Sequence, residues 1–123
     1  MNMIVNNNMY LFQLVGVYLQ SGNPEHVVLG DNVPVTLTCV TSDDYQIVSW
    51  TKDNKNIARI RNDCVFSSIP DNTYNYTCDV ANTIYSLIIP PDAITDGIQN
   101  VVWRCNPIIG IGSNKWSLTV SGT

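Results

Sequence analysis

The chain contains few charged residues and almost none of the groups used for acid–base catalysis. Of its 123 residues 13% are charged, and it has one glutamate, Glu25, and one histidine, His26. A Ser-His-Asp or Cys-His site would need His26 as its base, and no nucleophile motif stands beside that residue. We therefore expect a protein that is not an enzyme.

Basic residues are also few, and they form no stripe along the chain. Four of the six lysines and arginines fall between Lys52 and Arg61, and the net charge is −4. Proteins that bind nucleic acid carry an extended basic surface. We therefore exclude a nucleic-acid partner and interpret the basic cluster as a solvated β-hairpin.

Motifs for metal or cofactor binding are incomplete. The adjacent Asp43 and Asp44 supply too few oxygens for calcium and point in opposite directions on an extended chain. The glycines of residues 110–113 begin like a phosphate-binding loop, but the third glycine and the following helix are missing. We expect no cofactor and no metal.

Long apolar runs and helical periodicity are missing as well. The apolar stretch at residues 9–19 is shorter than the roughly 20 residues of a transmembrane helix, and no lysine or arginine precedes it as in a signal peptide. In no stretch of ten or more residues do the apolar residues recur with the 3.6-residue period of an amphipathic helix. We predict that residues 1–14 are a leader or a remnant of expression. Residues 15–123 are then one domain that does not itself contact a membrane.

The chain is rich in strand and turn residues. Valine, isoleucine, threonine, tyrosine, serine and asparagine dominate it, and its length suits one β-sandwich. Alternation of apolar and polar residues predicts strands. The predicted strands cover residues 15–20, 35–39, 47–51, 57–60, 75–80, 84–89, 101–105 and 115–120, with turns at 30–32 and 53–56 and a stop at Pro90-Pro91.

Two cysteines bracket a tryptophan in this pattern. Cys39 ends one predicted strand, Trp50 lies in the next, and Cys105 ends a strand that also contains Trp103. With a period of two, each cysteine shares a face with apolar residues of its own strand. This order of cysteine, tryptophan and cysteine resembles the immunoglobulin superfamily, and the long step between the cysteines leaves room for the extra strands of a variable-type domain.

The resemblance implies a fold and a core. It implies an all-β, immunoglobulin-like sandwich of the V type, built of two antiparallel Greek-key sheets. Trp50 and Trp103 would lie in its core. Trp103 stands where the family has a tyrosine that donates a hydrogen bond, and its indole N–H is expected to donate a similar one.

The resemblance also implies how the four cysteines pair. The family framework selects a disulfide between Cys39 and Cys105, which leaves Cys64 and Cys78 for a second one. Free thiols and metal ligation are the alternatives, although zinc lacks a Cys-x-x-Cys pair here. Two disulfides in so small a domain favour an extracellular setting, at the cell surface or secreted. A sequon at Asn75 predicts N-glycosylation there.

Recognition in the family uses the loops at one end of the sandwich and the outer face of one sheet. A cluster of isoleucines at a predicted hairpin tip is either a contact patch or packed back on the N-terminal segment. The candidate partner-binding residues are Tyr45, Ile108, Ile109 and Ile111 in the loops, and Ile47, Val102 and Arg104 side by side on the sheet face.

The resemblance therefore predicts a non-enzymatic recognition module. It would be the ectodomain of a cell-surface receptor or adhesion protein, binding a protein partner in a homophilic or heterophilic way. The alternative is a secreted innate-defence protein that binds glycans or microbial surfaces. Exposed aromatic rings with amides typify carbohydrate sites, and this alternative would use Tyr45, Tyr74 and Tyr76 near Asn72 and Asn75.

Overall fold

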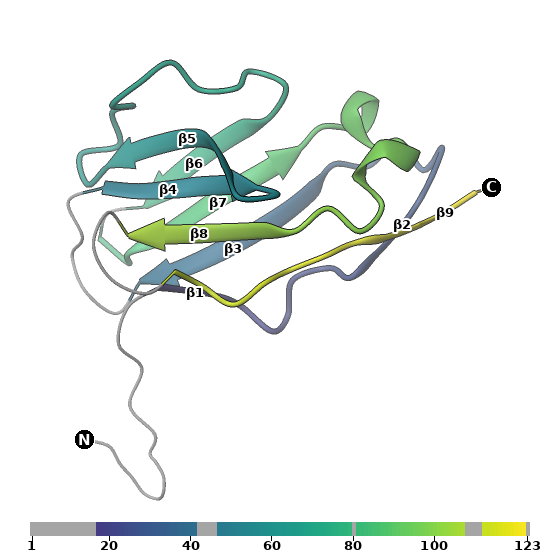
Figure 1. Ribbon diagram of the computed structural model, residues 1–123, viewed down its shortest axis with the longest axis horizontal. Helices are drawn as coiled ribbons and strands as arrows, with labels where there is room; N and C mark the ends of the chain where they lie inside the picture. The colour runs from purple at the N-terminus through teal and green to yellow at the C-terminus, as the bar shows by residue number, and fades with distance from the viewer. Residues whose placement is uncertain (1–16, 42–46, 80, 108–111, 123) are drawn as a thin grey trace, which may run out of the picture.

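The computed structural model describes residues 17–41, 47–79, 81–107 and 112–122, which form a β-sandwich (Figure 1). One sheet has the strand order β1-β3-β7-β6 and the other β5-β4-β8, while β2 and β9 form a separate pair. The elements are β1 (Val17–Leu19), β2 (His26–Val28), β3 (Val35–Thr41), β4 (Ile47–Lys52), β5 (Lys55–Arg61), β6 (Asn75–Asp79), β7 (Ile84–Ile89), the short 3₁₀ turns η1 (Pro91–Ala93) and η2 (Asp96–Ile98), β8 (Trp103–Pro107) and β9 (Thr119–Ser121). In this described part of the chain no helix is long and apolar enough to cross a membrane.

The hairpin of β4 and β5 is tighter than the sequence predicts. Lys52 already pairs with Lys55, so the loop consists of Asp53 and Asn54 alone. Both loop residues have positive φ, 50° and 68°, which is the geometry of a type I′ turn. Aspartate and asparagine tolerate this left-handed conformation, and the turn fixes the register of the whole hairpin.

The two main sheets are antiparallel, as the resemblance implies, and a separate pair that the sequence does not predict, β2 with β9, is parallel. His26 lies opposite Thr119 and Val27 opposite Val120. The last predicted strand is correspondingly shorter, since Trp116 and Leu118 take part only in isolated bridges. A strand as short as β2 leaves no period to detect in the sequence, and its partner is distant along the chain.

A buried asparagine, Asn23, marks the point where the chain leaves the sheet of β1 and β3 for the separate pair of β2 and β9. β1 pairs with β3 as far as Leu19, opposite Cys39. Beyond it, the Asn23 side chain accepts a hydrogen bond from the Thr38 N–H at 2.9 Å and donates one to the Thr38 carbonyl at 3.0 Å. The amide thus takes the place of a further strand residue, while the Asn23 N–H donates to the Gln20 carbonyl at 3.1 Å in the turn that leads toward β2.

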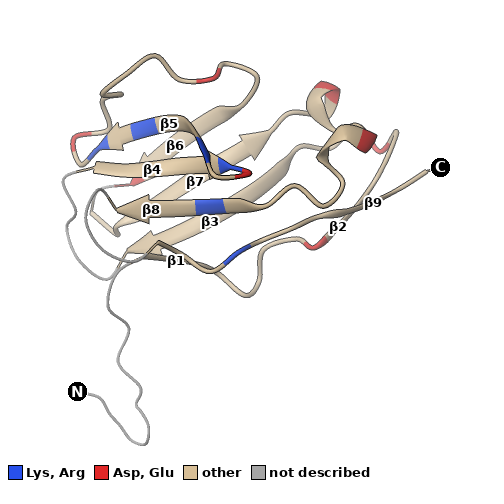
Figure 2. Cartoon of the chain, viewed as in Figure 1, with Lys and Arg blue, Asp and Glu red and all other residues tan. Residues whose placement is uncertain are grey.

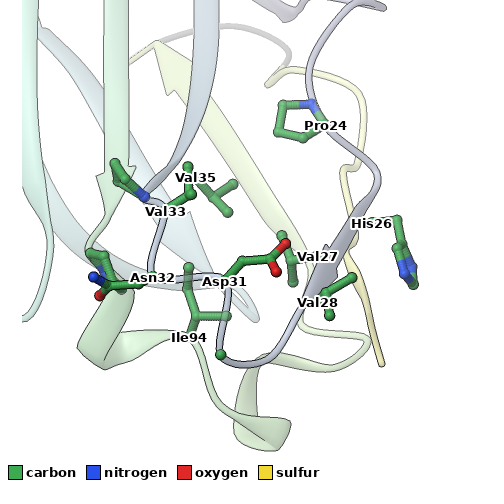
Figure 3. A pocket seen from close by; sticks show the side chains of 12 residues that line it. Pro24, His26, Val27, Val28, Asp31, Asn32, Val33, Val35 and Ile94 are labelled. Atoms are coloured by element: carbon green, nitrogen blue, oxygen red, sulfur yellow. The ribbon is translucent and has the colours of Figure 1, made fainter. Parts of the chain in front are cut away.

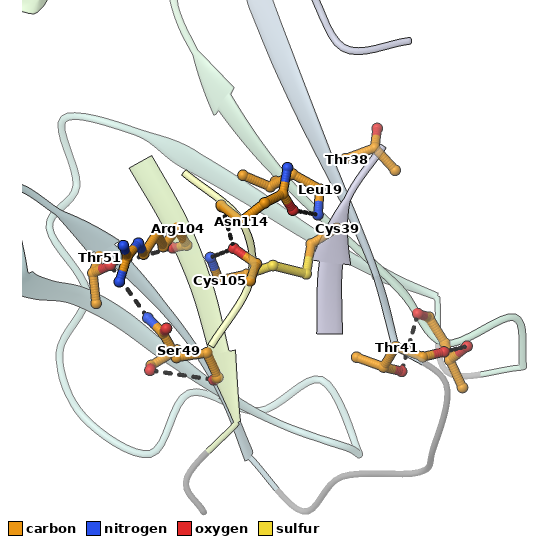
Figure 4. The surroundings of a disulfide bond; sticks show 12 residues. Leu19, Thr38, Cys39, Thr41, Ser49, Thr51, Arg104, Cys105 and Asn114 are labelled. Carbon is orange, nitrogen blue, oxygen red and sulfur yellow. Dashed lines mark hydrogen bonds between the residues drawn. A yellow bond between two sulfur atoms is a disulfide. The ribbon is translucent and has the colours of Figure 1, made fainter. Parts of the chain in front are cut away.

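The two main sheets enclose a core that a disulfide crosses. Cys39 of β3 bonds to Cys105 of β8, and both are fully buried. Ser113 pairs with the Cys105 backbone in both directions, through its N–H and its hydroxyl. The side chain of Asn114 accepts from the Leu19 N–H at 2.9 Å (Figure 4). These contacts tie the segment after β8 to Cys105 and to Leu19, the residue opposite Cys39.

Trp50 and Trp103 are fully buried in this core. The Trp103 ring packs edge-on against Tyr74, with ring centroids 5.5 Å apart. The expected hydrogen bond from its indole N–H is not present, because that nitrogen has no acceptor among the described residues. Among the described residues, Trp103 is therefore held by packing and not by a hydrogen bond of its indole N–H.

The segment between β5 and β6 is fastened to the edge of β5 and to β6. Arg61 and Val65, then Ser67 and Arg59, are joined by backbone hydrogen bonds, and an antiparallel bridge joins Ile60 to Phe66. The second disulfide connects Cys64 with Cys78 of β6. The described residues contain no free cysteine, so the pairing is the one that the resemblance implies.

Candidate functional site

The outer face of the β5-β4-β8 sheet carries ordered rows of side chains. Ile47 of β4 lies opposite Arg61 of β5, and Arg61 in turn neighbours Val65. Directly opposed residues of an antiparallel pair project on the same side of the sheet. Because Ala58 and Ile60 of β5 are buried, their neighbours along the strand project outward.

A second row runs beside the first. It contains Asn106 of β8, Ser49 of β4 and Arg59 of β5, followed by Ser67 on the adjoining segment. Hydrogen bonds link the strands on this side: the Ser49 hydroxyl donates to the Asn106 carbonyl at 3.4 Å, and the Asn106 amide donates to the Thr51 hydroxyl at 3.2 Å (Figure 4). The face is thus a fixed surface made of short polar groups between arginines.

A shallow hollow opens in this surface. It has a volume of about 220 Å³ and is lined by Ile47, Ser49, Asn56, Arg59 and Pro107. Aliphatic, hydroxyl, amide and guanidinium groups therefore meet in one small depression. Such a mixture suits a side chain of a protein partner, because it offers both apolar contact and directed hydrogen bonds.

Positive charge is concentrated on this sheet although the protein is acidic overall. Five of the six lysines and arginines lie on β4, β5 and β8. The sixth, Lys115, precedes the bridge between Trp116 and Trp103 at the other edge of the sheet. Figure 2 shows most of the basic positions on this sheet, whereas the acidic positions lie mainly in the turns and the 3₁₀ segments.

The two arginines of β5 differ in their surroundings. Arg61 donates to the carboxylate of Asp63, and this hydrogen bond holds the pKa of Asp63 below its usual range. Arg59 is exposed, and no ion pair involves it among the described residues. Arg59 is therefore the guanidinium best placed to meet an acidic or carbonyl group of a partner.

The structure separates the sheet-face candidates that the sequence placed side by side. Because β4 and β8 are antiparallel, the Ile47 end of β4 lies beside Pro107. Arg104 lies opposite Thr51, four residues farther along, which is about 13 Å at the usual rise of a strand. Val102 exchanges two hydrogen bonds with Asp53 at the hairpin tip. Ile47 is therefore the only one of the three beside the hollow.

Tyr45, Ile108, Ile109 and Ile111 lie outside the described residues, as do Asp43 and Asp44. Gly112, which follows them, is pressed against β8, because a Cβ at that position would come within 1.8 Å of the Asn106 Oδ1. No larger residue fits at position 112 unless Asn106 moves.

The aromatic rings suggested for glycan binding are used inside the molecule. Tyr74 is buried against Trp103. Tyr76 packs edge-on against Phe66, and its hydroxyl donates to the Asp71 carbonyl at 2.9 Å. Tyr74 therefore offers no free face for stacking on a sugar, and the hydroxyl of the half-buried Tyr76 is already hydrogen-bonded within the molecule.

Tyr76 makes the stability of the domain sensitive to alkaline pH. Burial raises the pKa of its phenol above the ordinary value near 10, because the charged form would lose hydration. Above pH 10 the unfolded chain releases this proton more readily than the folded one. We expect the free energy of unfolding to fall there as the pH rises, by less than the limit of about 1.4 kcal/mol per pH unit, because Tyr76 is only half-buried and solvent screens part of the effect. In urea titrations at several pH values above 10, the free energy of unfolding should fall less steeply with pH for Tyr76→Phe than for the parent. Equal pH dependence of the two proteins would contradict this role of Tyr76.

His26 joins β2 to β9 through hydroxyl groups. Its Nδ1 lies 2.6 Å from the Thr119 hydroxyl and its Nε2 lies 3.1 Å from the Ser121 hydroxyl. A hydroxyl hydrogen-bonded to one nitrogen of an imidazole also occurs in the catalytic triad of serine hydrolases. In a triad, however, the other ring nitrogen is hydrogen-bonded to a carboxylate. Here Thr119 takes that place and donates onward to the Glu25 carbonyl. We interpret the group as a clamp between two parallel strands.

A larger pocket lies at the turn between β2 and β3. It has a volume of about 280 Å³ and reaches the 3₁₀ turn η1. Figure 3 shows Val27, Val28 and Ile94 around Asp31. Its lining is mostly aliphatic and proline, and Val33 at its rim is 60% exposed. The pocket has no group of ligands for a metal, since the described residues contain no cluster of three such side chains.

Sequence reasoning missed Arg59, Arg61 and Val65 as parts of one surface. The sequence signal for this surface is the basic cluster between Lys52 and Arg61, but by itself that cluster indicates only a solvated hairpin.

Comparison of the chain with protein-family models and with curated protein sequences finds no match.

Proposed function

We propose that this chain is an immunoglobulin-like, variable-type recognition domain of an extracellular receptor or adhesion protein. It binds a protein partner through the outer face of the β5-β4-β8 sheet. It acts by surface complementarity and performs no chemical step.

The strand arrangement supports the variable-type assignment. The order β1-β3-β7-β6 corresponds to the first sheet of an immunoglobulin domain, and β5-β4-β8 with the bridge at Trp116 corresponds to the second. The segment at residues 65–71, held to the edge of β5 by backbone hydrogen bonds, occupies the place of the extra strand in variable-type domains. The disulfide between β3 and β8 joins the two sheets.

The observation that carries the binding proposal is the exposed Arg59 beside the hollow. Arginine is among the side chains that contribute most to protein interfaces, because it combines apolar stacking with up to five donors. Ile47 supplies apolar area in the same depression. The two disulfides favour an oxidising, extracellular setting for this contact.

A charge reversal at Arg59 tests the proposal, with a second copy of the domain as the first partner. We expect reversible self-association in sedimentation equilibrium, and at least a tenfold weaker association for Arg59→Glu. Lys55→Glu is the matched control, since it makes the same charge change at an exposed residue of the same strand. Its association should stay within about threefold of the parent, because electrostatics alone act weakly at physiological salt.

Two results would count against the proposal. Equal weakening by both variants would show general charge effects in place of a local contact. A domain that stays monomeric at every concentration would remove the homophilic form, and a photo-crosslinker at Ser49 would then have to capture a cell-surface protein that Arg59→Glu releases.

A further inference from the structure

The sequon Asn75-Tyr76-Thr77 lies on an edge strand of the four-stranded sheet. β6 pairs only with β7 among the described residues, so its second edge has no strand partner. An edge strand offers unpaired N–H and C=O groups to any other extended chain, and proteins protect such edges with charge, proline, bulges or a cover. Asp79, at the far end of β6, is the only charged side chain of this strand.

The side chains that a glycosyltransferase must reach both face solvent. Burial alternates along β6, with Asn75 and Thr77 exposed and Tyr76 and Cys78 partly buried. Neither Asn75 nor Thr77 has a side-chain hydrogen bond within the described ranges. The disulfide of Cys78 and the hydrogen bond of the Tyr76 hydroxyl hold the strand in this orientation.

The sheet beside Asn75 is nearly uncharged on its outer side. Asn75 lies opposite Ile88, which lies opposite Thr36. The next row contains Thr77, Ser86 and Thr38. This surface contrasts with the other sheet, which carries the arginines.

A hollow next to Asn75 can receive the first sugars. It has a volume of about 440 Å³ and is lined by Asn72, Thr73, Asn75, Pro90, Asp92 and Ala93. Its amide, hydroxyl and carboxylate groups match the hydrogen-bonding needs of sugar hydroxyls. The hollow lies between the start of β6 and the 3₁₀ turn after β7.

We propose that Asn75 carries an N-linked glycan that covers the free edge of β6 and the adjoining outer face. Protein contacts are thereby directed to the opposite, basic sheet. The donor is an oligosaccharide linked to a lipid pyrophosphate. The Asn75 Nδ2 forms a bond to the sugar C1, the bond from C1 to the pyrophosphate oxygen breaks, the lipid pyrophosphate leaves with the electron pair, and one amide proton passes to solvent. The inference rests on the extracellular setting of the proposed function.

Occupancy is tested on the full chain secreted from eukaryotic cells. Intact mass and digestion with an amidase specific for N-glycans should reveal one glycan, converting Asn75 to aspartate on removal. Thr77→Ser should keep the glycan, while Thr77→Ala and Asn75→Gln should lose it. Secreted protein with both disulfides formed and Asn75 unmodified would overturn the inference and leave the proposed function standing.

The covering role is tested by association of the glycan-free protein. In an Arg59→Glu background, the Asn75→Gln protein should self-associate at least tenfold more strongly than the glycosylated protein. Without the glycan the free edge of β6 is uncovered, and two copies can then pair through that edge. Adding Thr77→Lys should reverse this gain, since a lysine protects an edge strand. Equal association with and without the glycan would overturn the covering role. If Arg59→Glu leaves association unchanged in glycosylated protein, the proposed binding face fails and the glycan site stands.

Discussion

Replacing both Cys39 and Cys105 with alanine is expected to lower the free energy of unfolding by roughly 4 kcal/mol, the chain-entropy value for a loop of this length. The bond joins residues 66 positions apart and lies in the fully buried core. A small domain has about 5–15 kcal/mol of stability in total. The loss should appear as a lower denaturation midpoint in guanidinium, with both sheets unfolding together.

The second disulfide is the control for this prediction. Cys64 and Cys78 are 14 positions apart, so the same reasoning assigns about 3 kcal/mol to their bond. Cys64 is exposed and Cys78 is only partly buried at the margin of the core, so removal should leave the packing of Trp50 and Trp103 intact in near-ultraviolet circular dichroism. A Cys39/Cys105 double variant as stable as the parent would contradict the role of the first bond.

Replacing Asn23 with alanine should cost about 2 kcal/mol. The change leaves the Thr38 N–H without its acceptor beside the core, and an unsatisfied backbone donor costs roughly 1–3 kcal/mol. It should also free the chain where it passes from β1 to β2. Hydrogen exchange should therefore quicken at Thr38 and across β2, while β7 keeps its protection.

Asn72→Ala is the matched control for Asn23→Ala. Asn72 is an exposed asparagine in a loop, and its replacement should change stability by no more than about 0.5 kcal/mol. Equal stability of the two variants in urea titrations would show that the Asn23 amide does not hold the strand.

Much of the fold can be predicted from local sequence patterns. Alternation in Ile84–Ile89 predicted both bounds of β7 and its inward residues Tyr85, Leu87 and Ile89. Period two works here because one side of each strand is buried and the other is not. The same pattern fails for β2, whose three residues are too few to show a period and whose partner strand is about 93 residues away.

The candidate site was predictable only in its parts. The basic residues between Lys52 and Arg61 were visible as a cluster, but the alignment of Ile47 with Arg61 depends on the two-residue turn and on a register shift after Trp50. A change of register by one residue would reverse which side chains face outward. The grouping of Ile47 with Val102 failed for a related reason, since antiparallel pairing sends them to opposite ends of the sheet.

Local sequence therefore determines the fold class of this protein, because the alternation of apolar residues and the turn residues specify strands and turns within stretches of only a few residues. It places Cys39, Trp50 and Cys105 on inward faces and leaves a sandwich as the structure that buries them. Tertiary structure alone decides that the chain leaves β1 at Asn23 for a parallel pair with β9. It also decides that Arg59 shares a hollow with Ile47. Both depend on pairings between distant segments, whose register follows from the packing of the whole domain and from no short stretch of sequence.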